Sequence, residues 1–173
     1  MTVLSIRIYP DPVLRVRCSQ VETFDNELRQ LISNMVETMH DAPGIGLAAP
    51  QVGVERRVCV VDLSAGERPE DLLVLVNPRV LAEEGTDEDE EGCLSVPGFT
   101  EKVKRPFSVK VEAVDGEGDE IRVEVEALLA RAIRHEIDHL DGILFTDRLR
   151  GLRRERGRRA LKRLAKEQDA ERS

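Results

Sequence analysis

The sequence contains no tryptophan, only 3% aromatic residues, and only three cysteines and three histidines. Cys18, Cys59 and Cys93 are odd in number and show no CxxC spacing, which excludes the disulfide framework of a small secreted protein. No apolar run approaches the roughly 18–20 residues of a membrane span, and the first residues lack the features of a signal peptide. We therefore expect a cytoplasmic protein with no membrane partner, in which each cysteine is a buried thiol, a metal ligand or a nucleophile.

The length and charge of the chain predict one solvated domain with an uneven charge distribution. A chain of 173 residues buries roughly 70% of its unfolded surface, so it can form a core without disulfides. The net charge is −8, but residues 148–173 carry 11 basic and 4 acidic residues. The acidic remainder argues against binding to DNA, whereas the basic segment could meet a polyanion. We expect residues 1–147 and the basic C-terminal helix or tail, residues 148–173, to belong to the same single domain.

Hydrophobic periodicity predicts three helices and several short strands. Asp25 is the expected N-cap of the first helix, and Gly142 is the expected stop after the second. The acidic run Glu83–Glu91 is interpreted as a solvated loop. The fold class that follows is α+β, with mixed or antiparallel small sheets around a central helix, an N-terminal helix and a C-terminal helix. The expected helices cover residues 25–40, 127–140 and 149–167, and the expected strands cover 57–63, 71–77, 107–114 and 120–126.

Two of the histidines form an HExxH pattern, His135-Glu136-Ile137-Asp138-His139, on the second predicted helix. Residues at i and i+4 are about 40° apart around a helix, so both imidazoles can bind one metal ion. Glu136 is long enough to bend back and act as a base toward water at that metal. The alternative is a pair of surface histidines, but Leu128 and Ala132 make the histidine face apolar.

A catalytic site of this kind needs a third protein ligand and one open position. No histidine follows His139, so the downstream candidates are carboxylates such as Asp147 and Glu155. Upstream, Cys93 lies in a glycine-rich segment unlike a core strand and could supply a thiolate. Cys59, inside an apolar run, is interpreted as a core residue.

A small-residue segment, Gly44-Ile45-Gly46-Leu47-Ala48-Ala49-Pro50-Gln51, is the third candidate element. Its glycines permit close approach of the backbone to a neighbour. Gln51 can donate and accept hydrogen bonds without adding charge. Alone, this segment is a weak indication of a binding loop.

Together, the segments Gly44–Gln51, Glu91-Gly92-Cys93-Leu94-Ser95 and His135–His139 resemble the GxGxAAxQ, EGCxS and HExDH motifs of peptide deformylases. The resemblance runs from about Ile8 to Asp147 and would make residues 1–147 the catalytic domain. It implies that Cys93, His135 and His139 bind Fe²⁺, which Ni²⁺ or Zn²⁺ can replace; the donor types alone would favour zinc. It also implies that Glu136 is the general acid/base and that the Gln51 side chain and the Leu94 backbone N–H stabilise the oxyanion.

The implied substrate is the N-formylmethionine of a newly made polypeptide, which would be hydrolysed to formate and a free amino terminus. We expect Leu128 and Ala132 to line the methionine pocket. We expect the peptide to pair in strand fashion with the segment Gly44, Ile45 and Gly46. In bacterial members the C-terminal helix is associated with the ribosome, so residues 148–173 are a candidate ribosome-binding element near the exit site.

Three positions depart from the common family pattern: Ala127 replaces a frequent glycine, Arg134 a frequent glutamine, and Thr100 an arginine of some members. None is a ligand or the base, so only specificity and the entry into the metal helix are affected. His40 is expected to have a structural role at a helix end.

Two other functions are alternatives to a deformylase. One is a different HExxH metallopeptidase with a downstream ligand, and the other is a ribosome-associated binding module with an inactive site.

Overall fold

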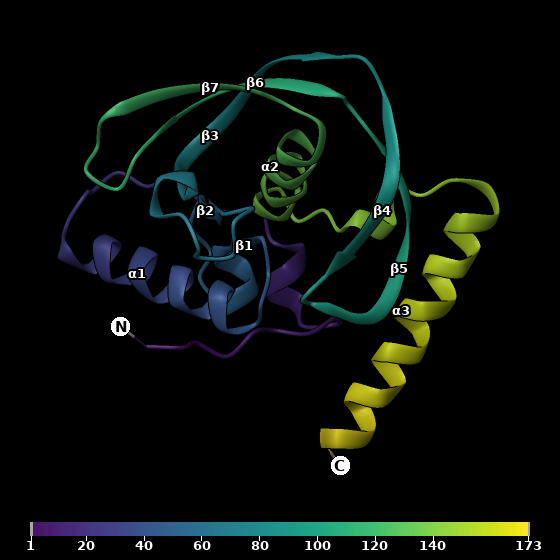
Figure 1. Ribbon diagram of the computed structural model, residues 1–173. Coiled ribbons are helices and arrows are strands. Elements are labelled where there is room, and N and C mark those ends of the chain that lie inside the picture. Colours follow the sequence, from purple (N-terminus) through teal and green to yellow (C-terminus); the bar gives the residue numbers. More distant parts are fainter. Residues whose placement is uncertain (1, 173) are drawn as a thin grey trace.

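The computed structural model describes residues 2–172 and confirms the α+β class. Residues 1 and 173, at which the predicted segments 1–147 and 148–173 begin and end, lie outside the described residues. Among the described residues there are three α-helices and seven strands (Figure 1). No helix in this part of the chain is both long and apolar enough to cross a membrane. The helices are α1 (Asn26–Asp41), α2 (Ala127–Leu140) and α3 (Gly151–Arg172). The strands are β1 (Gly46–Ala48), β2 (Val58–Val61), β3 (Leu73–Glu84), β4 (Asp87–Cys93), β5 (Val96–Arg105), β6 (Ser108–Val114) and β7 (Glu120–Glu126).

The strands form two antiparallel sheets that curve around α2 (Figure 1). One sheet has the order β1-β2-β3-β6-β7, and the other is the β4-β5 hairpin. Helix α2 contacts β1, β2, β6 and β7, and its apolar side chains join the core of the larger sheet. This packing is what brings the HExxH motif next to the glycine segment that includes β1.

Helix α1 begins where the sequence predicted, because Asp25 accepts a hydrogen bond from the backbone N–H of Leu28 at 2.9 Å. Its apolar stripe packs on β1 and β2 as a second core cluster. His40, in the last turn, lies with Nε2 2.8 Å from Oδ2 of Asp62. It does not line the main cavity, so the structural role expected for His40 is the one observed.

The interpretation of Glu83–Glu91 as a solvated loop is wrong. Strand β3 continues to Glu84 and β4 begins at Asp87, so that only a turn with Gly85 at φ +71° separates them. Opposite the acidic residues of β4, strand β5 places Lys102 and Lys104, in register with Glu90 and Glu88. Opposite charges across a strand pair favour pairing, which offsets the low strand propensity of the acidic residues.

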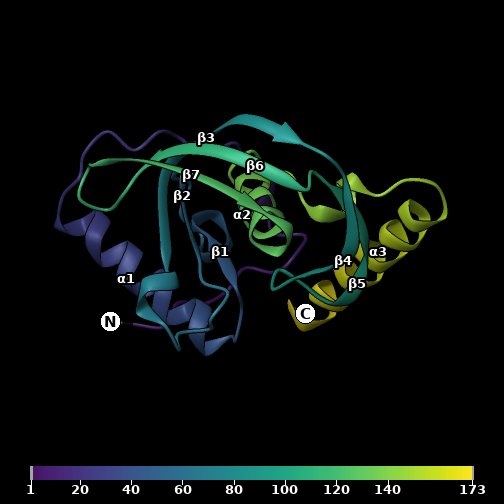
Figure 2. The same ribbon diagram turned by 45° about the horizontal axis from the view of Figure 1, so that its top comes forward.

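Helix α3 lies outside β5, on the far side of the molecule from α1, in both views (Figure 1 and Figure 2). Leu164 is buried against a third core cluster that includes Phe145 and Leu149. Arg153 and Arg156 both approach Glu101 of β5. The helix is therefore held by an apolar stripe and by ion pairs to the β4-β5 hairpin.

Candidate metal centre

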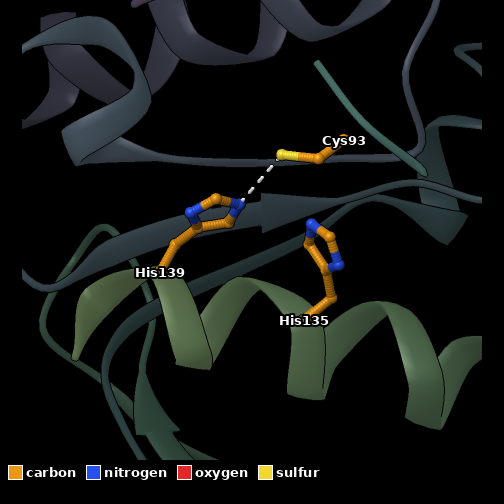
Figure 3. Close-up of side chains that lie close together, drawn as sticks. All are labelled: Cys93, His135 and His139. Atoms are coloured by element: carbon orange, nitrogen blue, oxygen red, sulfur yellow. Dashed lines mark hydrogen bonds between the residues drawn. The ribbon is translucent and has the colours of Figure 1, made fainter. Parts of the chain in front are cut away.

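Three side chains from two elements meet in the centre of the molecule. His135 and His139 project from α2 toward Cys93, which ends β4 (Figure 3). The Sγ of Cys93 lies 3.3 Å from Nε2 of His139, and one ligand atom from each of the three residues lies within 4.8 Å of the others. Two imidazoles and one thiolate at this spacing fit a single transition-metal ion and leave a further position open.

Cys93 is positioned by an irregularity of the hairpin. The register shifts between Glu91 and Cys93, and Cys93 then pairs with Val96 across a tight turn. Burial raises the pKa of the Cys93 thiol, but the adjacent imidazoles of His139 and His135 outweigh burial and hold the pKa well below its ordinary value. The site therefore favours the thiolate, which is the form that binds a metal.

His135 is oriented by a buried carboxylate that the sequence interpretation missed. Its Nδ1 lies 2.8 Å from Oε1 of Glu91, which leaves Nε2 free to face the site. Burial raises the pKa of Glu91, but hydrogen bonds from Arg105 and His135 hold it far below its usual range. Glu91 is two residues before the ligand Cys93 in the sequence. This position is the sequence feature that could have pointed to a role for Glu91 at the metal site.

A second buried carboxylate, Asp138, extends this network on the same helix. Arg105 donates to Oδ2 of Asp138 at 2.7 Å and also to Glu91 at 2.8 Å. Arg148, eight residues after the end of α2, donates to Oδ1 of Asp138 at 2.8 Å. Asp138 therefore points away from the ligand set and anchors the metal helix to the hairpin, which explains why Glu136 and not Asp138 is available as a base.

Glu136 lies on α2 with its carboxylate against Gly46 of β1. A Cβ at Gly46 would overlap Oε2 of Glu136, so glycine is needed for this approach. Oε1 of Glu136 is buried and has no hydrogen-bond partner among the described residues. Burial raises the pKa of Glu136, as is typical of a carboxylate that exchanges protons with a substrate.

Gln51 brings an amide group to the thiolate. Its Oε1 accepts from the backbone N–H of Ala48 at 3.0 Å, which fixes the orientation of the amide. Its Nε2 donates to Oγ of Ser95 at 3.1 Å and lies 3.6 Å from Sγ of Cys93. The side chain is only 2% exposed, so a second N–H is held beside the metal ligands.

A cavity of about 500 Å³ opens beside these residues. Its walls come from the glycine segment, the β4-β5 hairpin and α2. All of the sequence-predicted substrate residues line it, and so do Leu94 and Thr100. The predicted residues on its wall are Gly44, Ile45, Gly46, Gln51, Cys93, Leu94, Leu128, Ala132, His135 and Glu136.

The downstream carboxylates do not reach the histidines. Asp147 pairs with Arg15 and accepts from the backbone N–H of Leu144, and Glu155 pairs with Arg158 on α3. A metallopeptidase site with either residue as third ligand is therefore excluded. Cys59 lies fully buried in β2, as predicted.

The structure shows the local surroundings of two of the unusual positions. Arg134 forms an ion pair with Glu83 at 2.9 Å, which ties α2 to the end of β3. Ala127, the first residue of α2, has φ +57°, a left-handed conformation that favours glycine.

Comparison with known proteins identifies close relatives over almost the whole chain. The family model described as polypeptide deformylase matches residues 3–155. The peptide deformylase of Thermodesulfovibrio yellowstonii is 50% identical over 162 residues, covering 94% of this chain and 98% of that protein. The peptide deformylase of Alkalilimnicola ehrlichii is 49% identical over 167 residues, covering 96% and 93%.

Solved structures agree with these sequence matches. A peptide deformylase from Legionella pneumophila is 43% identical with a TM-score of 0.88, over 97% of this chain and 98% of that chain. A plant peptide deformylase is 37% identical with a TM-score of 0.94, over 99% of this chain and 94% of that one. The chain is thus similar to deformylases in sequence and in fold.

Proposed function

The chain belongs to the peptide deformylase family, and from this premise we propose how its residues divide the work of the reaction. The enzyme removes the N-formyl group from the amino terminus of newly made polypeptides. Water adds to the formyl carbon, the bond from that carbon to the amine nitrogen breaks, and formate and a free amino terminus result. The observation that carries the assignment of roles is that Cys93, His135, Glu136 and Gln51 line one cavity, with a ligand atom of His139 within 4.8 Å of those of Cys93 and His135.

Cys93, His135 and His139 would hold the metal ion, and we propose Fe²⁺, which Ni²⁺ or Zn²⁺ can replace. Their two nitrogen donors and one sulfur donor suit all three ions. When bound, the ion supplies a Lewis acid, which makes water a nucleophile near neutral pH. The buried Glu91 supports the site from behind, since its hydrogen bond to Nδ1 of His135 fixes the ring and its tautomer.

Glu136 acts as the general acid/base. Its unpartnered Oε1 accepts the proton of the attacking water. The same carboxyl group then passes that proton to the leaving amine nitrogen. Because burial raises the pKa of Glu136, the group can hold the proton between the two steps.

Gln51 and the Leu94 backbone N–H stabilise the charge that develops on the formyl oxygen. The Gln51 amide is already oriented by Ala48 and Ser95, so little reorganisation is needed when the charge appears. One such donor is worth about 3 kcal/mol of transition-state stabilisation in related chemistry.

The cavity would take the methionine side chain against Leu128 and Ala132, both on its wall. Strand β1 pairs with β2 alone and is the edge of its sheet. A substrate peptide can therefore add along the segment Gly44, Ile45 and Gly46 by backbone hydrogen bonding.

A formate-release assay on formyl-Met-Ala-Ser, with protein carrying iron or nickel, tests the activity directly. We expect turnover that depends on the metal. An occupied metal site with no formate released would overturn the assignment and favour a binding module with an inactive site.

We also propose that α3 docks the enzyme on the ribosome near the exit site, and that the enzyme acts in the cytoplasm. Several exposed basic residues of α3 have no ion pair among the described residues, which leaves a cationic outer face. In this proposal α3 belongs to the same single domain, because Leu164 packs into the core with Phe145. The unpaired basic residues of α3 in this group are Arg154, Arg159, Lys162, Arg163 and Lys166.

Removal of α3 would also expose the core around Leu164, so substitution of charges is the sharper test. The triple variant Arg159→Gln/Lys162→Gln/Arg163→Gln should bind ribosomes more weakly, with a smaller salt dependence, and should retain turnover of short peptides. Ribosome binding equal to that of the unaltered enzyme would discard the docking proposal without affecting the deformylase assignment.

A further inference from the structure

Two of the charged side chains on the cavity wall, Glu91 and Arg131, are neutralised by buried partners. Glu91 is paired with Arg105 and Arg131 at 2.8 Å and 2.7 Å. Arg131 is 3% exposed and also donates to the backbone carbonyl of Val103. Neither Glu91 nor Arg131 therefore presents a free charge to a bound peptide.

Glu90 is different, because it lines the cavity and is exposed. Its Oε1 accepts a hydrogen bond from the hydroxyl of Thr100 at 2.7 Å, and Thr100 lines the same cavity. A hydroxyl partner holds the carboxylate in place but does not neutralise its negative charge.

Two cations lie on the elements next to Glu90, and neither forms an ion pair with it among the described residues. Lys102 is its cross-strand partner on β5, but it does not line the cavity. Arg131 reaches the backbone carbonyl of Asp89 at 3.4 Å and is otherwise held by Glu91 and Asp87. The edge of the cavity at Glu90 therefore presents a negative charge.

The position of Glu90 fixes which part of a substrate would meet it. Glu90 precedes the metal ligand Cys93 by three residues of β4, and the strand is irregular between Glu91 and Cys93, so the two residues are separated by at most about 10 Å. A peptide whose formyl group lies beside Cys93 covers the same length with about three extended residues. The side chains of the first and second residues after methionine can thus reach the Glu90 carboxylate.

We propose that Glu90 gives the enzyme a preference for formylated peptides with a basic side chain in one of the two residues after methionine. The proposal rests on the deformylase activity described above. A lysine or arginine side chain at this edge pairs with an exposed carboxylate, whereas an acidic side chain is repelled. For solvent-exposed charges we expect kcat/KM to differ by roughly three- to ten-fold between lysine and glutamate peptides at low salt.

The test compares kcat/KM for formyl-Met-Xaa-Ala and formyl-Met-Ala-Xaa amides, with lysine, glutamine or glutamate as Xaa, on the nickel-loaded enzyme. The lysine-to-glutamate ratio should exceed one in at least one series and fall toward one as salt is added. Glu90→Gln should bring the ratio to one, and Thr100→Arg, which places a counter-charge beside Glu90, should also lower it toward one. Glu124→Gln, on the exposed surface of β7 away from the cavity, is the matched control and should keep it.

A ratio of one in the unaltered enzyme at low salt, or an undiminished ratio in Glu90→Gln, would overturn the proposal. Absence of turnover with the glutamine peptides would instead overturn the deformylase function itself. The two failures are therefore distinguishable in one set of measurements.

Discussion

Nδ1 of His135 lies 2.8 Å from a carboxylate oxygen of Glu91, 44 residues earlier in the chain. The same carboxylate accepts from Arg105 and Arg131. Glu91 therefore joins α2 to the hairpin that carries Cys93. The positions of two of the three predicted metal ligands, Cys93 and His135, both depend on it.

Glu91→Gln should weaken metal binding by about 10–100-fold, because an amide is a poorer partner for Nδ1 of His135 than a carboxylate. It should also lower stability, since the buried guanidinium groups of Arg105 and Arg131 each lose one of their carboxylate partners. Competition with a chelator measures the first effect and urea unfolding the second. Glu124→Gln changes the net charge equally on an exposed strand and should alter neither; metal affinity unchanged in Glu91→Gln would remove Glu91 from this role.

Glu136→Gln should retain the metal and lower kcat by about 10²–10⁴-fold, because the amide cannot accept and return the proton. The fold should be preserved, since Oε1 of Glu136 has no hydrogen-bond partner among residues 2–172. Metal content and kcat are measured on the same preparation. Turnover near that of the unaltered enzyme would show that another group carries the proton.

Gly46→Ala tests how closely β1 must approach the base. A Cβ at Gly46 overlaps Oε2 of Glu136, so the carboxylate should be displaced and kcat/KM should fall by about 10-fold or more. Gly116→Ala is the control, because its Cβ would meet only the end of the Ile32 side chain, at 3.1 Å. Equal kcat/KM in Gly46→Ala and Gly116→Ala would show that catalysis tolerates a displacement of the Glu136 carboxylate.

The sequence predicted the elements whose signals are local. Asp25 and a regular apolar stripe marked α1, and alternation in residues 107–126 marked β6 and β7. Strand β1 has only three residues and no pattern, and β4 is acidic enough to be mistaken for a loop. Both are stabilised by partners far along the chain, which no window of sequence contains.

The same distinction holds for the site. The three motifs located the residues that line the cavity, because each motif is contiguous. The support of His135 by Glu91, and the pairing of Arg105 with Asp138 33 residues away, depend on how α2 packs on the hairpin. Such contacts follow from tertiary structure and leave no spacing rule in the sequence.

Ala127→Gly should stabilise the protein by about 1 kcal/mol, because Ala127 begins α2 at φ +57° and glycine adopts this conformation without a steric penalty. Ala130→Gly, one turn later and fully buried, should instead destabilise by about 1 kcal/mol or more. Urea unfolding measures the change in the free energy of unfolding for both variants, one at the first residue of α2 and one in its interior. A loss of stability in both would contradict the strain assigned to Ala127.

Asp62 should make stability depend on pH in the acid range. Burial raises its pKa, but hydrogen bonds from Ser64, His40 and Gly66 outweigh burial and hold the pKa below its ordinary value. In the unfolded chain the pKa returns to about 3.9, so the unfolded state binds the proton first on acidification. The stabilisation is therefore complete above about pH 4 and is lost as the pH falls through the lower, folded-state pKa.

Asp62→Asn should accordingly lower the free energy of unfolding by about 1.5–3 kcal/mol near pH 7, where charge-assisted hydrogen bonds are lost. The difference from the unaltered protein should narrow on acidification below about pH 4. Urea unfolding across this range, at matched metal content, measures both effects. Asp169→Asn, exposed on α3, should change stability near pH 7 by less than about 0.5 kcal/mol. If the Asp62→Asn difference stays constant as the pH falls, the carboxylate of Asp62 is not the group that titrates.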